Sequence, residues 1–389
     1  FLLCGGGSNY PDRPGWEGGA KKWHDDVWAL ATPRSRKWTR VGRLPRPMGY
    51  GVAVSIRQGV LIVGGADSHR HYPDCYVLSL EEDGLKVRPF PFLPRPLAYA
   101  AGALVGSKVI VAGGTGRPDA SSASSSAYAL DLANLNAGWK ELPLCTGGGR
   151  MLAQAAGTKD TFYLFGGISI APAAKGVERE HLSDCHAFTL GKEWRRLSPM
   201  PRPCAGAPSP CPVIGDRIWV LGGDDGSLSG KVEASKHPGY GKAVLSYSRM
   251  GDAWTQEPDG SGGALSTGCA PWGGGFAVTN GEARPFVRYV EGWRIRESCG
   301  WGLAEAPGSA NTEPDAPPQR IDPMARPHRD AAPRLRGRTG AARPARPARA
   351  GRHGRGHGAR RTRRGGDPRR RGLQFPRRAA LGRGRQTLL

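Results

Sequence analysis

Leu61-Ile62-Val63-Gly64-Gly65 is a run of apolar, β-forming residues that ends in a pair of glycines. The same pattern occurs at residues 2–6, 109–114, 162–167 and 218–223, and a degraded copy occupies residues 276–281. Successive glycine pairs are 49–59 residues apart. Each run is long enough for one buried strand, and glycine permits backbone conformations and close approaches that a Cβ atom blocks. Six copies at a nearly regular spacing indicate a repeat protein.

Two further elements recur around these runs. Pro-Arg-Pro turns lie upstream at residues 44–47, 93–96 and 200–203, and strand-like segments such as 26–30 and 75–78 lie downstream. A tryptophan then precedes the next turn, at Trp38, Trp139, Trp194 and Trp254. This order is typical of a four-stranded blade. One such sheet cannot bury both of its faces alone, so blades stack against their neighbours around an axis.

The pattern resembles the kelch repeat, and the expected fold is an all-β, six-bladed kelch-type β-propeller over residues 1–295. We expect the first blade to lack its innermost strand, because no strand pattern precedes the run at residues 2–6. The 59 glycines and 34 prolines exclude a helical bundle, since both residues interrupt helices. No apolar run approaches the ~20 residues of a transmembrane helix, so no transmembrane segment is expected.

Residues 296–389 differ in composition from the rest of the chain. Residues 301–389 contain 22 arginines, no lysine and six acidic residues, a net +16 of the formal +23. Because they lack a periodic apolar pattern, we expect a disordered, low-complexity basic tail. Three explanations stay open: a basic arm for nucleic acid or anionic lipid, a solvated extension, and out-of-frame translation of GC-rich DNA. The absence of lysine favours the third, so no nucleic-acid partner is expected.

Parts of residues 5–27 and 49–65 resemble one kelch family, the N-acetylneuraminate epimerases or sialic acid mutarotases. So does Asn280-Gly281-Glu282-Ala283-Arg284-Pro285-Phe286-Val287-Arg288, which is similar to the family signature N-G-E-x-[KR]-P-G-[LV]-R. In the better-known members this signature precedes the part that resembles residues 5–30, whereas here it comes last. The chain therefore resembles a cyclically permuted branch. Phe286 stands where the family has Gly, and Tyr289 stands where it has Thr.

The resemblance implies an isomerase that interconverts the α and β anomers of N-acetylneuraminate or a related sugar. Opening the sugar ring needs a base for the proton of the anomeric hydroxyl and an acid for the ring oxygen. The resemblance places the family's proton acceptor on Glu282. Arg284 and Arg288 share the face of Glu282 if the segment is extended, and there they would bind the substrate carboxylate. The alternative is a solvated, charged strand edge.

Two more residues are candidate substrate ligands. Arg150 follows a glycine-rich turn that resembles the G-P-R-D turn of the family. Asn9 lies in the long polar connection 7–25, which is positioned to arch over the central funnel. Ring opening requires no metal and no organic cofactor, and no pair of cysteines or histidines has the spacing of a zinc site.

A second function stays open, that of a non-catalytic propeller that binds a protein or glycan partner through its funnel. Glu282 among arginines distinguishes the two, because an adaptor needs no carboxylate beside cations at the axis. The resemblance also implies a small-molecule sugar substrate and a periplasmic or otherwise exported location, although the sequence shows no signal peptide.

Overall fold

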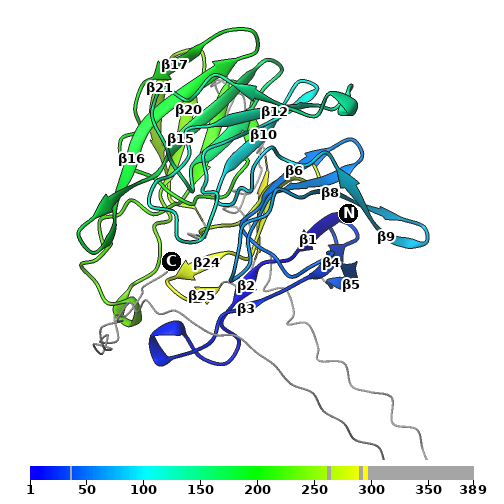
Figure 1. Cartoon of the computed structure of the whole chain (residues 1–389), viewed down its shortest axis with the longest axis horizontal. Helices are drawn as coiled ribbons and strands as arrows, with labels where there is room; N and C mark the ends of the chain where they lie inside the picture. The colour runs from blue at the N-terminus through cyan, green and yellow to red at the C-terminus, as the bar shows by residue number, and fades with distance from the viewer. Residues whose placement is uncertain (36, 261–263, 289–291, 297–389) are drawn as a thin grey trace, which may run out of the picture. The chain divides into compact units, whose positions relative to one another are not determined.

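Every glycine-ending run lies in an antiparallel sheet. The computed structural model describes residues 1–35, 37–260, 264–288 and 292–296. In this part of the chain, six larger sheets follow one another in sequence order, as Figure 1 shows. The helical segments there are three short 3₁₀ turns, η1 (Gly15–Glu17), η2 (Leu135–Ala137) and η3 (Ala234–Lys236).

Four of these sheets are complete four-stranded blades. The second blade contains β6 (Val52–Ile56), β7 (Gly59–Val63), β8 (Cys75–Glu81) and β9 (Gly84–Phe90). The third contains β10 (Ala101–Val105), β11 (Lys108–Ala112), β12 (Ala127–Asp131) and β13 (Trp139–Leu142). The fourth contains β14 (Gln154–Gly157), β15 (Thr161–Ala173), β16 (Gly176–Thr189) and β17 (Trp194–Leu197). The fifth contains β18 (Val213–Ile214), β19 (Arg217–Leu221), β20 (Val244–Ser248) and β21 (Ala253–Glu257).

The first and sixth sheets have three strands each within the described residues. The first contains β1 (Leu2–Gly5), β4 (Asp26–Leu30) and β5 (Thr39–Arg43), and the sixth contains β22 (Cys269–Pro271), β23 (Gly275–Thr279) and β26 (Gly292–Arg296). The run that ends in glycines lies at the edge of the first sheet and pairs only with β4 there. Two small hairpins stand apart from the blades, β2 (Ser8–Asn9) with β3 (Lys22–Trp23), and β24 (Glu282–Arg284) with β25 (Val287–Arg288).

Apolar clusters join each blade to the next. Val27 of the first blade packs with Ile62 and Tyr76 of the second, and similar clusters join the second to the third and so on to the sixth. The ring closes where Leu2 of the first blade packs with Ala277 of the sixth. Because every sheet buries both faces against its neighbours, the expected all-β, six-bladed propeller of the kelch type is confirmed.

The recurring tryptophans also connect neighbouring blades. The indole nitrogen of Trp139 donates a hydrogen bond of 2.8 Å to the carbonyl oxygen of Pro91, which ends the preceding blade. Trp194 makes the same bond to Pro143, at 2.8 Å, and Trp254 to Ser198, at 2.9 Å. Trp139 and Trp194 thus bury their rings, and Trp254 partly buries its ring, while each polar nitrogen keeps a partner.

The fourth blade departs from the repeat. The other glycine pairs end their strands, but β15 continues through Gly166-Gly167 as far as Ala173, with a register shift at the pair. A β-bulge inserts an extra residue and lets the ladder resume beyond it. Residues 168–173 of β15 therefore pair with residues 176–181 of β16 in a long hairpin, visible in Figure 1 beyond the body of the blade. The expectation that each such strand ends at its glycines is wrong for this blade.

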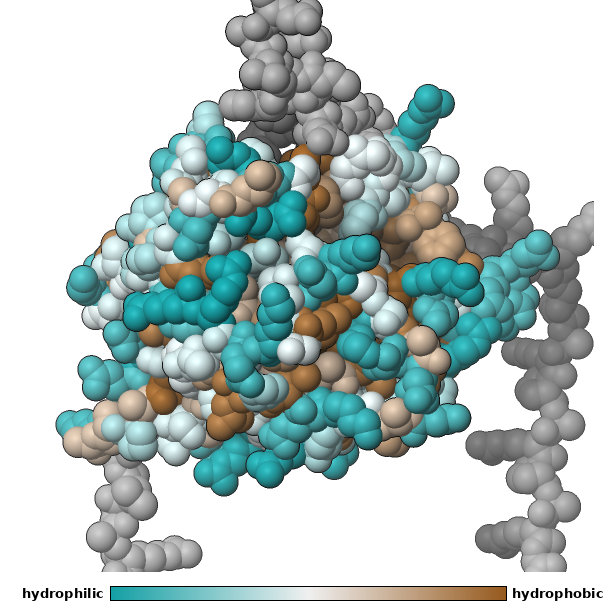
Figure 2. All heavy atoms as spheres, turned by 90° about the horizontal axis from the view of Figure 1, so that it is seen from above, coloured by the Kyte–Doolittle hydropathy of each residue, from teal (hydrophilic) through white to brown (hydrophobic). Residues whose placement is uncertain are grey.

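The predicted tail, residues 296–389, lies outside the described residues apart from Arg296, as does Tyr289. Among the described residues, no helix is long and apolar enough to cross a membrane. In Figure 2, hydrophilic side chains interrupt the brown patches on the face shown.

Candidate functional site

Five residues in equivalent loops adopt the left-handed backbone conformation before the inner strands of blades two to six. They are Tyr50, Tyr99, Leu152, Gly206 and Ser266, with φ between 55° and 66°. Their backbones form a chain of hydrogen bonds, because the amide of each residue after Tyr50 donates to the carbonyl of the one before it over 2.7–2.9 Å. We call these five residues the axial belt. All of them line one cavity.

The residues that follow the glycine pairs lie next to this belt. Ala66, Thr115, Ile168, Asp224 and Glu282 each form an isolated β-bridge with the residue just before a belt position. Glu282 therefore has the same place in the sixth blade as Asp224 has in the fifth. The carboxylate of Asp224 accepts a hydrogen bond from His181 at 3.1 Å, whereas Glu282 contacts an arginine. The repeat alone thus positions two carboxylates at one end of the axis.

Glu282 and Arg288 face each other across the β24–β25 hairpin. Nη1 of Arg288 lies 3.0 Å from Oε2 of Glu282, and the amide of Phe286 donates a bond of 2.9 Å to Oε1. Their side chains are only 12% and 19% exposed. The expectation that residues 282–288 form one extended segment is therefore wrong, because the chain turns back at Pro285-Phe286. The turn brings Arg288 to Glu282 and directs Arg284 elsewhere.

Arg288 also joins the two ends of the described chain. Its Nε donates to the carbonyl of Ser8 at 3.1 Å, so β25 lies beside β2, as Figure 1 shows. Its Nη2 donates to Oη of Tyr50 at 3.2 Å. Burial lowers the pKa of Arg288, but the charge of Glu282 and the contact with Tyr50 outweigh burial, and the pKa is raised. Arg288 is therefore a permanent cation with partners in three separate segments of the chain.

Tyr50 lies between two cations. Nζ of Lys21 donates to its hydroxyl oxygen at 2.7 Å, in addition to Arg288, and Oγ of Ser8 lies 3.4 Å away. Burial by itself raises the pKa of Tyr50, but the two positive charges outweigh it and lower the pKa below the usual 10.0. Tyr99 stacks on Tyr50 with ring centroids 4.5 Å apart, and burial raises its pKa.

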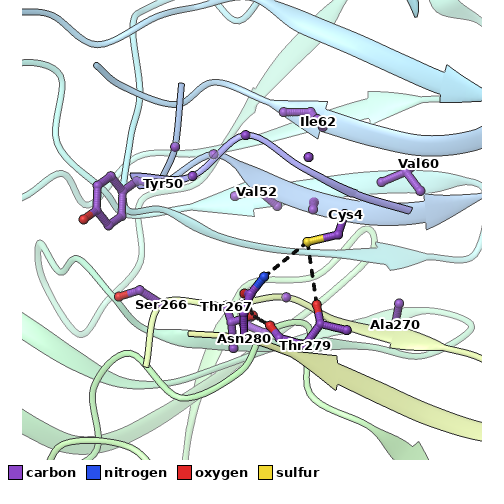
Figure 3. Close-up of a pocket in the computed structure, with 18 of the residues that line it drawn as sticks. Cys4, Tyr50, Val52, Val60, Ile62, Ser266, Thr267, Ala270, Thr279 and Asn280 are labelled. Atoms are coloured by element: carbon purple, nitrogen blue, oxygen red, sulfur yellow. Dashed lines mark hydrogen bonds between the residues drawn. The ribbon is translucent and has the colours of Figure 1, made fainter. Parts of the chain in front are cut away.

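The cavity beside these residues has a volume of about 700 Å³, within the range of small-molecule sites. It is lined at one end by Ser8, Asn9, Tyr50 and Arg288 and extends along β1, β6 and β22. Figure 3 shows Tyr50 at one end and Cys4 deeper inside, where Cys4 contacts Asn280 and Thr279. The lining cation Arg288 thus lies at the end that Tyr50 occupies, and Asn280 and Thr279 are the polar groups deeper inside.

The remaining predicted ligands have different surroundings. Oδ1 of Asn9 lies 2.8 Å from Nε2 of His24, at the cavity. Arg284 donates to the carbonyl of Ser235 at 3.2 Å and lies over the ring of Trp16. Its guanidinium is therefore held against protein groups on the side of the hairpin away from Arg288.

Arg150 is completely buried. Its guanidinium makes two bonds to Asp184, of 2.9 and 2.7 Å, and two more to the carbonyls of Gly166 and Gly147. These are the contacts of a structural ion pair within the fourth blade. A role for Arg150 in substrate binding stays a prediction, and these contacts do not support it.

Phe286 occupies a backbone position suited to glycine, with φ 66°. Its ring packs edge-on against Tyr10 and Trp16 at centroid distances of 5.2 and 5.9 Å. The departure from the family signature is thus filled by an aromatic cluster that ties the 7–25 connection to the β24–β25 hairpin. The sequence signalled this departure but not its aromatic partners.

Sequence reasoning assigned no role to Tyr50 or Lys21. Both lie in segments that resemble the epimerase family, and this was the only signal for them. Lys21 is 29 residues from Tyr50 in sequence, and Arg288 is 238 residues from it. Only closure of the ring brings these three side chains together.

Comparison with known proteins shows which family this chain is similar to. The family model for N-acetylneuraminate epimerase matches residues 90–235, a segment that does not contain the β24–β25 hairpin. The N-acetylneuraminate epimerase of Haemophilus influenzae strain 86-028NP is 27% identical over 231 residues, which are 52% of this chain and 58% of that protein. The N-acetylneuraminate epimerase of Salmonella enteritidis PT4 is 36% identical over 76 residues, or 17% of this chain and 19% of that one.

The match thus spans little more than half the length of the Haemophilus protein and about a fifth of the Salmonella protein. Among solved structures, "Structure of YjhT" superposes with a TM-score of 0.55 at 13% identity, over 71% of this chain and 89% of that one. This likeness supports the propeller fold alone. The cyclic permutation stays a prediction. The resemblance inferred from the sequence is confirmed, because the family model and the curated relatives agree that this chain is similar to the N-acetylneuraminate epimerases.

Proposed function

We propose that the protein interconverts the α and β anomers of N-acetylneuraminate, or of a related 2-keto sugar acid, by acid/base ring opening. The observation that carries this proposal is the Glu282–Arg288 ion pair, whose arginine lines a cavity of about 700 Å³. A carboxylate and a cation in contact are the groups that the reaction needs at the anomeric carbon. The names of the curated relatives point to the same substrate.

The anomeric carbon of such a sugar carries both the hydroxyl that must lose its proton and the carboxylate that must be held. Glu282 accepts one bond at each oxygen, from Phe286 and Arg288, and each oxygen keeps a further acceptor site. Glu282 is therefore able to receive the hydroxyl proton. Arg288 uses three of its five N–H groups in the bonds to Ser8, Glu282 and Tyr50, and two remain for the substrate carboxylate.

Anomer exchange followed by NMR tests the proposal. The α-anomer of N-acetylneuraminate is released fresh in the presence of the full chain, and the approach to the equilibrium mixture is compared with the spontaneous rate. Acceleration in proportion to protein concentration is the expected result. If the sugar binds without acceleration, the alternative of a non-catalytic propeller that binds a glycan is supported instead.

We also propose that the protein is exported to the periplasm or an equivalent compartment. This rests only on the resemblance to the epimerase family. Fractionation of cells that express the complete gene tests it, and recovery of the protein solely in the cytoplasmic fraction would exclude it.

A further inference from the structure

We propose that Tyr50 is the acid of the ring-opening reaction, donating a proton to the ring oxygen while Glu282 receives one from the anomeric hydroxyl. This inference rests on the proposed function and assigns the second proton-transfer group that the function requires. The geometry that points to it is Arg288, which bonds Glu282 through Nη1 and Tyr50 through Nη2. One guanidinium, which itself lines the cavity together with Tyr50, thus contacts both groups.

The contacts of the Tyr50 oxygen leave its proton available. A neutral phenol accepts up to two hydrogen bonds and donates one. Lys21 and Arg288 donate into the oxygen at 2.7 and 3.2 Å, and both are cations without acceptor capacity. Ser8 Oγ is farther away, at 3.4 Å. The O–H is therefore free to donate to a substrate bound at the end of the cavity that Tyr50 lines.

The backbone and the neighbouring ring fix the position of Tyr50. Its φ of 59° is a left-handed conformation that costs a non-glycine residue about 1–2 kcal/mol. Its carbonyl accepts the amide of Tyr99, whose ring stacks on it. Trp23, on β3 of the β2–β3 hairpin, contacts the Tyr50 ring at a centroid distance of 5.7 Å. Strain of this kind persists only where surrounding structure imposes it, and it clusters at functional sites.

The two cations make Tyr50 a stronger acid than an ordinary tyrosine. When Tyr50 gives up its proton, the resulting phenolate is stabilised by Lys21 and Arg288, so its pKa is lowered despite burial. Tyr99 has the same backbone conformation, but its pKa is raised by burial. The other ionisable groups around Tyr50 are Glu282, Tyr10 and Tyr240, and burial raises the pKa of both tyrosines. Tyr50 is thus the tyrosine of this group best suited to donate a proton near neutral pH.

The proton transfers balance over the full reaction. Glu282 takes the proton of the anomeric hydroxyl, the bond between the anomeric carbon and the ring oxygen breaks, and the ring oxygen receives the Tyr50 proton. The products of this step are the open-chain keto sugar, a protonated Glu282 and a Tyr50 phenolate. After rotation about the bond to the keto carbon, the phenolate takes back the proton and the ring recloses on the other face. Glu282 returns its proton to the new anomeric hydroxyl, so no other reactant is needed.

The test compares Tyr50→Phe with Tyr128→Phe in the full chain. Both substitutions keep an aromatic ring, and Tyr128 is a buried residue of β12 that does not line the cavity. We expect Tyr50→Phe to lower kcat for anomer exchange by about 10²-fold or more, as for other positioned acids. Tyr128→Phe should keep kcat within the same order of magnitude.

The pH profile provides a second readout that a structural role would not change. Since the acid must be protonated, activity above the spontaneous rate should fall as pH rises through the pKa of Tyr50, below the usual 10.0. Lys21→Met removes one cation and should move this descending limb upward by about one pH unit or more. This variant keeps Tyr50, so it tests the proposal even if Tyr50→Phe fails to fold.

The possible outcomes separate the two proposals. Loss of turnover in Tyr50→Phe alone, or an upward shift of the limb in Lys21→Met, supports Tyr50 as the acid. Equal activity of the two Phe variants, or a limb that Lys21→Met does not move, overturns it and leaves the proposed function intact. An unmutated protein that does not accelerate exchange overturns both.

Discussion

Arg288 lies directly opposite Glu282 in the β24–β25 hairpin, and its Nη1 donates a hydrogen bond of 3.0 Å to the Glu282 carboxylate. The pairing depends on the turn at Pro285-Phe286, which places residues six positions apart on adjacent strands. The same guanidinium contacts Ser8 and Tyr50. The candidate site is therefore assembled where the last described blade meets the first two.

Glu282→Gln should abolish most of the acceleration of anomer exchange. Glutamine keeps the shape and accepts the bond from Phe286 but cannot take up the hydroxyl proton, and a positioned base contributes ~10²–10⁴-fold. NMR exchange spectroscopy measures the rate, and circular dichroism checks the fold. Glu178→Gln, on the exposed hairpin of β16, is the matched control and should leave the rate unchanged. An unchanged rate in Glu282→Gln removes Glu282 as the base.

Arg288→Ala should raise KM and lower kcat together. It removes the cation for the substrate carboxylate and also the group that holds Glu282 and Tyr50 in place. Each charge-assisted bond contributes about 1.5–3 kcal/mol, so kcat/KM should fall by about 10²-fold or more. Arg88→Ala, on the outer strand β9 and more than half exposed, is the control. A pure change in KM would show that Arg288 binds substrate without positioning the other two residues.

Asp184→Asn should destabilise the protein by about 3–5 kcal/mol, because it leaves Arg150 buried without a counter-ion. Asp131→Asn removes a partly exposed ion pair with Lys108 and should cost about 1 kcal/mol or less. Urea unfolding of the three proteins at neutral pH measures the difference. Equal losses in the two variants would mean that the buried pair contributes no more than a surface pair.

The Asp184 pair should also make stability depend on pH. Burial raises the pKa of Asp184, but hydrogen bonds from His186 and Arg150 outweigh it and lower the pKa well below the usual 3.8. A carboxyl with a depressed folded-state pKa stabilises the protein fully above its unfolded pKa and loses that contribution as pH falls below it. The unfolding free energy of the unmutated protein should therefore drop below about pH 4 more steeply than that of Asp184→Asn. Parallel curves would contradict this.

At position 286, glycine should give a more stable protein than alanine, which is the reverse of the usual order of stability. In a strand, a glycine normally makes the protein less stable than an alanine does, by about 0.5–1 kcal/mol. At φ 66° alanine keeps the left-handed strain and glycine does not, so Phe286→Gly should be more stable than Phe286→Ala by about 1 kcal/mol. Both variants should be less stable than the unmutated protein, because they lose the packing on Tyr10 and Trp16. Thermal midpoints of the three proteins decide the order.

The sequence predicted the parts of the fold that depend on local pattern. The glycine pairs, the Pro-Arg-Pro turns and the tryptophans each repeat, and a sheet built from them must stack on copies of itself. The long β15–β16 hairpin was not predicted, because a bulge at Gly166-Gly167 gives no signal that differs from a strand end. Arg150 was predicted to be a substrate ligand because the sequence shows the glycine-rich turn before it. The sequence does not show that the carboxylate of Asp184 neutralises Arg150.

By itself, the sequence determined the number of blades and placed Glu282 after the degraded glycine pair Asn280-Gly281, because strand periodicity and glycine conformations are local properties. Only the tertiary structure decided which side chains surround Glu282. Lys21, Tyr50 and Arg288 belong to three separate segments, and their contacts exist because the ring closes through apolar packing of Leu2 against Ala277. The Tyr50 phenol lies between two cations as a result of that closure. Its pKa depends on its burial and on its distances to Lys21 and Arg288, and no single segment of the sequence encodes these.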